Sequence, residues 1–131
     1  MTDTKTLTSV NKALKEKFKG HKLVFGQGAI GSRVLVVSEM LDPHGEKDGT
    51  PVGGPHMKLL AKLLKEAGID RRKVYVTNVV KYRPVADKQP TPKEIKSHAS
   101  FLKEEIRTVN PEIVVTLGNL ALNGVGLRIP V

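Results

Sequence analysis

Three pairs of residues, each with at least one polar side chain, stand at the ends of apolar runs or inside them, and they are the residues of this sequence best suited to chemistry. The pairs are Ser38-Glu39, Thr77-Asn78 and Gly118-Asn119. An asparagine in a buried run needs both a donor and an acceptor partner, because burying an unpaired amide costs on the order of 1–3 kcal/mol. Asn78 therefore either bonds a nearby backbone turn or presents its amide to a ligand, and an asparagine amide suits the edge of a nucleobase.

The elements that position these pairs alternate between strands and helices. Short continuous apolar runs, typical of buried strands, cover 33–39, 74–80 and 111–119. Apolar spacing predicts helices over 9–18, 56–70 and 91–110. Ser9 and Thr91 are the expected N-caps of the first and third helices. The stretch from Leu41 to Pro55 holds four glycines and three prolines, which predicts a long functional loop instead of an element.

Apolar strands separated by helices indicate βαβ units with parallel strands. The predicted fold class is α/β: a three-layer α/β/α arrangement around a short, mainly parallel central sheet. We expect a single domain over 1–131 that includes an N-terminal helical segment, 1–20. In an open parallel sheet, ligands bind outside the carboxyl ends of the strands, which is where the three polar pairs would gather.

Charge and composition narrow the function classes. The chain has 22 Lys and Arg against 13 Asp and Glu, for a formal net charge of +9, which favours a polyanionic partner such as DNA. It has no cysteine, which excludes disulfides and thiolate metal sites within the chain. Apolar runs are too short for a spanning helix, so we expect no membrane partner and a cytoplasmic, nucleoid-associated location. The four histidines lack i, i+4 spacing, and we expect no metal and no cofactor.

Five blocks of sequence resemble the uracil-DNA glycosylase superfamily, and most of all its iron-sulfur family 4 type. The blocks are FGQGAIGSRVLVVSE, GTPVGG, AGIDRRKVYVTNVVKYRP, TPKEI and NPEIVVTLGNLAL, in order from Leu23 to about Leu122. The resemblance implies an α/β/α fold that binds DNA, flips uracil or another modified base into a pocket, and hydrolyses its N-glycosidic bond.

The resemblance also implies roles for individual residues. Glu39 matches the family's acidic residue at the end of the first strand, near the catalytic water, where a carboxylate can polarise water and stabilise a positively charged sugar. Asn78 matches the base-reading asparagine, and the backbone of Met40 and Leu41 occupies the place that binds the uracil O2 atom. The expected DNA contacts are Lys81, Arg83, Gly54 and Asn119.

The sequence also departs from the family pattern near the pocket. SEMLD replaces GEAPG, so Asp42 adds a carboxylate that is either a second acid-base group or a cap of its loop. Val52 stands where the family has the phenylalanine that stacks on uracil, and stacking on an aromatic ring is worth about 1–3 kcal/mol per base. The family's C-terminal strand and catalytic histidine are expected to lie beyond Val131. His44 or His56, in the same loop as Asp42, are candidates for that role.

Two of the family's cluster cysteines align with Tyr82 and His98, so the resemblance implies that the iron-sulfur cluster is lost. We expect Tyr82 to replace it by packing, and we read His98 and His21 as structural.

Two functions of different class remain open. The first is a cluster-free DNA glycosylase that uses Glu39 and Asn78. The second is a non-catalytic descendant that keeps the fold and binds DNA or a protein partner. An exposed strand at the edge of the sheet would also allow oligomers to form.

Overall fold

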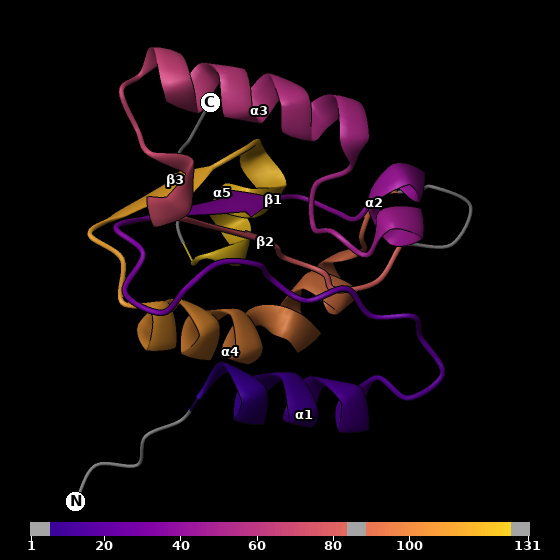
Figure 1. Ribbon diagram of the computed structural model, residues 1–131. Coiled ribbons are helices and arrows are strands. Elements are labelled where there is room, and N and C mark those ends of the chain that lie inside the picture. The colour runs from indigo at the N-terminus through magenta and orange to yellow at the C-terminus, as the bar shows by residue number, and fades with distance from the viewer. Residues whose placement is uncertain (1–5, 84–88, 127–131) are drawn as a thin grey trace, which may run out of the picture.

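The computed structural model describes residues 6–83 and 89–126, and Figure 1 shows their arrangement. Residues 1–5 of the expected N-terminal segment, Pro84, and the end of the chain at Val131 lie outside the described residues. The elements in chain order are α1 (Leu7–Lys17), β1 (Val34–Ser38), α2 (Pro43–Asp48), α3 (Gly54–Glu66), a 3-10 turn (Arg71–Lys73), β2 (Val74–Asn78), α4 (Pro92–Val109), β3 (Ile113–Thr116) and α5 (Asn119–Gly124).

The three strands form one parallel sheet in the order β2-β1-β3. Val34 at the start of β1 lies opposite Val74 of β2 and Ile113 of β3. All three strands therefore end at the same edge, as the βαβ pattern predicts. The predicted α/β fold class is confirmed.

Alternate residues of β1 face opposite layers, as expected of a strand buried on both sides. Val34 and Val36 pack with α3 on one face. Leu35 and Val37 pack on the other face with residues of α4 and α5. Figure 1 shows α3 on one side of the sheet and α4 on the other, with α1 lying along the outer side of α4. The core thus has two halves, one on each side of the sheet.

Three local expectations are corrected. The strand β3 is not buried, because it lies at the edge of the sheet and is only partly covered: Ile113 is 56% exposed and Val115 36%. The stretch 41–55 contains a short helix, α2, because Asp42 caps it and Pro43 starts it. The N-cap of α1 is Thr6, since its side chain accepts a hydrogen bond from the backbone of Ser9 in a capping box.

The outer edge of β2 is covered by an extended segment near Gln27. The backbone N–H of Gln27 donates to the Val76 carbonyl at 2.8 Å, and the Val76 N–H donates back at 2.9 Å. The Val24 N–H also donates to the Lys81 carbonyl at 2.8 Å. These bonds fix the segment against the sheet. None of the described helices is long and apolar enough to cross a membrane.

Candidate active site

A pocket of about 430 Å³ opens at the carboxyl ends of β1 and β3. Its lining comes from the end of β1 and the residues after it up to Asp42, the 49–54 segment, α3 and the residue after β3. Among the residues singled out from the sequence, Glu39, Met40, Asp42, Val52 and His56 line it. The other lining residues are Ser38, Pro51, Leu59, Leu60, Leu63 and Leu117. The pocket is mostly apolar with carboxylates at its rim, a composition that suits a flat ring with a polar edge.

Glu39 is half-buried where β1 ends. Its Oε2 atom accepts a hydrogen bond of 3.0 Å from the backbone N–H of Leu120, in the first turn of α5. No hydrogen bond within the described residues engages its other oxygen, Oε1. The carboxylate is therefore held in one orientation with a lone pair left for a water molecule or a ligand.

Gly118 lets Glu39 reach α5. Gly118 has a φ of +95°, and a Cβ atom at this position would overlap Oε2 of Glu39. We expect Gly118→Ala to lower the free energy of unfolding by about 2–3 kcal/mol. The change has two costs: the strain of a positive φ at a residue with a Cβ atom, and the displacement of the Glu39 side chain. Urea unfolding followed by circular dichroism measures this loss.

Gly31→Ala is the matched control for that change. Gly31 has a similar φ of +87°, but a Cβ atom there meets nothing within 4 Å. Gly31→Ala should therefore lower the free energy of unfolding only by the cost of backbone strain, about 1–2 kcal/mol. Equal losses in the two variants would mean that Glu39 is not held as described.

Asp42 caps α2 and pairs with His56. Its Oδ1 accepts from the Gly45 N–H at 2.7 Å, and its Oδ2 lies 2.9 Å from Nδ1 of His56. Partial burial works to raise the pKa of Asp42, but the hydrogen bond from Gly45 and the contact with His56 outweigh it, so the pKa lies below the usual value. Asp42 is thus an ionised cap. His44 is exposed on α2 and does not line the pocket.

Asn78 is buried at the end of β2, with 1% of its surface exposed. Its Nδ2 donates to the Pro51 carbonyl at 2.7 Å, so the amide does bond backbone, although this partner lies 27 residues away and not in a neighbouring turn. Its Oδ1, however, is buried and has no hydrogen-bond partner among the described residues. Asn78 itself does not line the pocket, whereas Pro51 does. The amide is therefore oriented by the backbone and keeps an unused acceptor.

Lys81 is internal, and the expected phosphate contact from this residue is corrected. It is 1% exposed, and its Nζ donates to Glu105 Oε1 at 2.7 Å, to the Thr77 hydroxyl and to the Asn78 carbonyl. With its three N–H donors engaged inside the protein, Lys81 has none to offer to DNA.

Glu105 joins Lys81 to two further buried side chains. Its Oε2 accepts from the Tyr75 hydroxyl at 2.6 Å and from the Thr77 hydroxyl at 2.9 Å. Burial, together with the adjacent Glu105 charge, raises the pKa of Tyr75. Sequence reasoning missed this network, although Glu105 follows Leu102 by three residues on the apolar stripe of α4. A carboxylate on that stripe is a signal of a buried partner.

The other residues expected to contact DNA or the base lie on different elements and do not form one surface with the pocket lining. Arg83 is partly exposed, with its Nε 3.8 Å from Oε1 of Glu46. Gly54 is the first residue of α3, and Asn119 is exposed at the start of α5. The side chain of Leu41 is fully buried, so only its backbone remains for a ligand.

A ring cluster, Phe18, His21, Tyr82 and His98, joins α1, α4 and the chain after β2. His21 stacks on Tyr82 with ring centroids 4.0 Å apart, and Phe18 stacks on His98 at 4.2 Å. Tyr82 is 8% exposed, so it packs as expected. Burial and the bond to Glu94 raise the pKa of Tyr82 to about 12. Of these four residues, Tyr82 and His98 are the two that align with cluster cysteines of the family pattern, and without a thiolate the ring cluster does not fit an iron-sulfur cluster.

His98 makes the ring cluster sensitive to acid. Burial lowers the pKa of His98, and nearby Lys81 and Lys17 lower it further, although its Nδ1 donates to the Glu94 carbonyl at 2.8 Å. Its Nε2 is buried and finds no partner in the part of the chain that the structure describes, so protonation there is disfavoured in the folded state. A depressed pKa means that the unfolded chain binds the proton more readily. We expect stability to be full above about pH 6.5 and to fall as the pH drops below it.

Urea unfolding at pH 7.5 and at pH 5 tests this expectation. His98→Gln should reduce the difference in unfolding free energy between the two pH values. The control His44→Gln, at an exposed position, should leave the difference as in the parent. The same pH dependence in the His98→Gln variant and the parent would rule His98 out as its source.

Comparison with known proteins agrees with this geometry. Residues 25–128 match the family model described as the uracil DNA glycosylase superfamily. The type-4 uracil-DNA glycosylase of Thermotoga maritima is 40% identical over 101 residues, 77% of this chain and 53% of that protein. That of Sulfurisphaera tokodaii is 36% identical over 94 residues, 71% of this chain and 43% of that protein. A DNA polymerase of Bacillus phage SP01 is 36% identical over 98 residues, 74% of this chain and 11% of that protein.

The chain thus spans about half the length, or less, of these relatives. The match to the family model covers most of the chain, including all three strands and the pocket at their carboxyl ends. This chain belongs to the uracil-DNA glycosylase superfamily.

Proposed function

We propose that this protein binds DNA and hydrolyses the N-glycosidic bond of uracil or another modified base held in the Glu39 pocket. The observation that carries the proposal is the orientation of Glu39: one carboxylate oxygen is anchored on α5 and the other has no partner within the described residues. The pocket of about 430 Å³ is within the size range of small-molecule sites. The family relationship supports the substrate class.

Glu39 would act on water and on the sugar. Water held by its Oε1 attacks C1′ of the flipped nucleotide as the bond from C1′ to the base nitrogen breaks. The carboxylate stabilises the positive charge that develops on the sugar and accepts the proton of the attacking water. The base leaves with the electron pair of the broken bond and finally receives that proton, so the products are an abasic site and the free base.

Asn78 would read the base. Its Oδ1, which no described residue bonds, suits the N3–H donor of uracil, because a buried acceptor of this kind gains a hydrogen bond when such a ligand arrives. Because Pro51 lines the pocket and Asn78 does not, this contact requires Pro51, whose carbonyl holds the Asn78 amide nitrogen, to give way. The apolar side chain of Val52 would contact the face of the base.

A uracil-containing oligonucleotide tests the proposal in a gel assay of abasic-site formation. Glu39→Gln keeps an acceptor for the Leu120 N–H but loses the charge, and it should lower the rate about 100-fold or more. Asn78→Ala should lower it as well. Glu112→Gln makes the same chemical change at the opposite end of the sheet, where Glu112 pairs with Arg33, and should leave the rate unchanged. Modified pyrimidines extend the assay, and absence of cleavage of all of them would refute the enzymatic proposal.

The second candidate is a non-catalytic protein that binds DNA or a partner. The position of Asn78 favours it, because this residue does not line the pocket and its amide nitrogen is bonded to Pro51. Salt-sensitive binding to the oligonucleotide without cleavage would support this candidate.

A further inference from the structure

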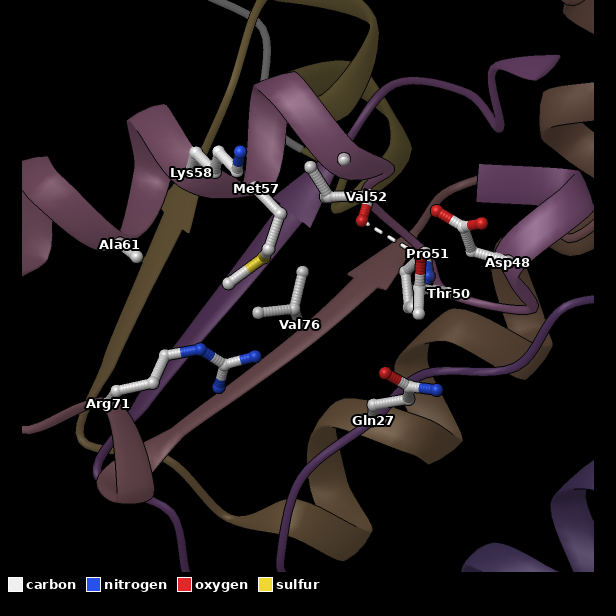
Figure 2. Close-up of a pocket in the computed structure, with 11 residues that line it drawn as sticks. Gln27, Asp48, Thr50, Pro51, Val52, Met57, Lys58, Ala61, Arg71 and Val76 are labelled. Atoms are coloured by element: carbon white, nitrogen blue, oxygen red, sulfur yellow. Dashed lines mark hydrogen bonds between the residues drawn. The ribbon is translucent and has the colours of Figure 1, made fainter. Parts of the chain in front are cut away.

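A second pocket lies on the other side of the Pro51-Val52 segment, and Figure 2 shows it. It has a volume of about 410 Å³, between α3, β2 and the extended segment that carries Gln27. The Glu39 pocket shares only Pro51 and Val52 with it. From these features we propose that the second pocket binds a nucleoside monophosphate, either free or as one unit of a DNA strand. This inference does not depend on glycosylase activity.

The centre of the pocket is apolar and suits the face of a base. Val76 of β2 is 1% exposed and forms the floor, and Met57 of α3 lies above it in Figure 2. Val52 adds a further apolar wall. A thioether and branched aliphatic groups make favourable contacts with aromatic rings. The pocket is also about the size that a nucleotide requires.

Gln27 and Asp48 provide acceptors at one end. The Nε2 of Gln27 donates to the Gly49 carbonyl at 3.2 Å, which turns the amide oxygen toward the pocket interior (Figure 2). The backbone of Gln27 is fixed by its two bonds to Val76, so the side chain starts from a rigid point. The Asp48 carboxylate also lines this end. Two acceptors favour a base that carries an exocyclic amine, such as cytosine, adenine or guanine, over uracil.

Arg71 and Lys58 provide positive charge at the rim. Figure 2 shows the Arg71 side chain extending toward Val76, on the side away from Gln27. Its Nη1 donates to the Val74 carbonyl at 3.4 Å, which leaves most of its N–H donors available. Within the described residues, neither Arg71 nor Lys58 forms an ion pair. A phosphate therefore fits at the Arg71 end, away from the Asp48 carboxylate.

The methionines allow a direct test. Met57 lines this pocket and Met40 lines the Glu39 pocket, so the two methyl groups of a protein labelled with 13C-methyl methionine report the pockets separately. Titration with dCMP, dAMP or dGMP should shift the Met57 methyl signal through the ring current of the base, with saturation, and leave Met40 unshifted. dUMP should bind more weakly.

Variants and competitors complete the design. Arg71→Gln should raise the dissociation constant about tenfold, since it removes charge-assisted bonds to the phosphate. Arg72→Gln is the matched control, because Arg72 is the next residue, does not line the pocket and pairs with Asp70. A short single-stranded oligonucleotide that shifts Met57 would identify a DNA strand as the source, whereas a response only to mononucleotides would identify free nucleotide. No saturable shift of Met57 with any of these ligands, or a shift of Met40 alone, would overturn the proposal.

Discussion

Glu105→Gln is expected to lower the free energy of unfolding by about 3–5 kcal/mol at neutral pH. Glu105 is 1% exposed, and its carboxylate neutralises the buried ammonium of Lys81. The amide would leave that ammonium without a counter-charge and would place N–H donors among groups that already donate. Urea unfolding followed by circular dichroism, with the slope compared to the parent, measures the loss.

Two further variants isolate the cause. Glu112→Gln makes the same change in an ion pair whose side chains are both 62% exposed, and its effect should stay below about 1 kcal/mol. The double change Glu105→Leu with Lys81→Met removes both charges and should be less destabilising than Glu105→Gln. If Glu105→Gln costs no more than Glu112→Gln, Lys81 reaches solvent in solution, and its role as a DNA contact becomes tenable again.

Tyr82→Ser is expected to lower the free energy of unfolding by about 3 kcal/mol, equivalent to a fall in melting temperature of roughly 10 °C. The change removes the ring that stacks on His21 and contacts Phe18, and it leaves a void between α1 and α4. Because the sequence has no cysteine to form a covalent or metal link, this packing holds α1 against the segment that follows β2. Thermal unfolding followed by circular dichroism measures the effect.

Tyr82→Phe is its matched control. It keeps the ring and loses only the hydroxyl that bonds Glu94, so it should cost about 1 kcal/mol. A Tyr82→Ser melting curve that matches the parent would mean that Tyr82 is a surface residue with no structural role.

Local patterns were sufficient to predict β1, β2, β3, the longer helices α1, α3 and α4, and their order, but not the short helices α2 and α5. The β-branched run of β2, the capping box of α4 at Thr91 and the glycine after α3 act over a few residues, so they can be read without the fold. Parallel pairing followed from the alternation of strands and helices, and the structure confirms it. The burial of β3 was predicted wrongly, because an apolar run shows that a strand can be buried but not whether a neighbour covers it.

The location of the candidate site could be predicted from the sequence, but the contacts that orient its side chains could not. The sequence alone determined that Glu39, Asn78 and Asn119 stand at strand ends, because strand ends are local features and parallel strands end at one edge. It did not determine that Pro51 holds the Asn78 amide or that Leu120 holds Glu39, since these contacts join residues 27 and 81 positions apart.

Tertiary structure alone decided the roles of the polar and aromatic residues outside the pocket. Lys81, in the basic segment that follows β2, is an internal ion and not a surface cation. The reason is that Glu105 of α4, 24 residues away along the chain, lies beside it and bonds its ammonium. The ring cluster formed because α1 packs along α4 and brings Phe18 onto His98. Composition and periodicity show which side chains can ionise or stack. The partner that each side chain meets depends on how elements distant in the sequence pack together. That partner sets the charge, the burial and the function of the side chain.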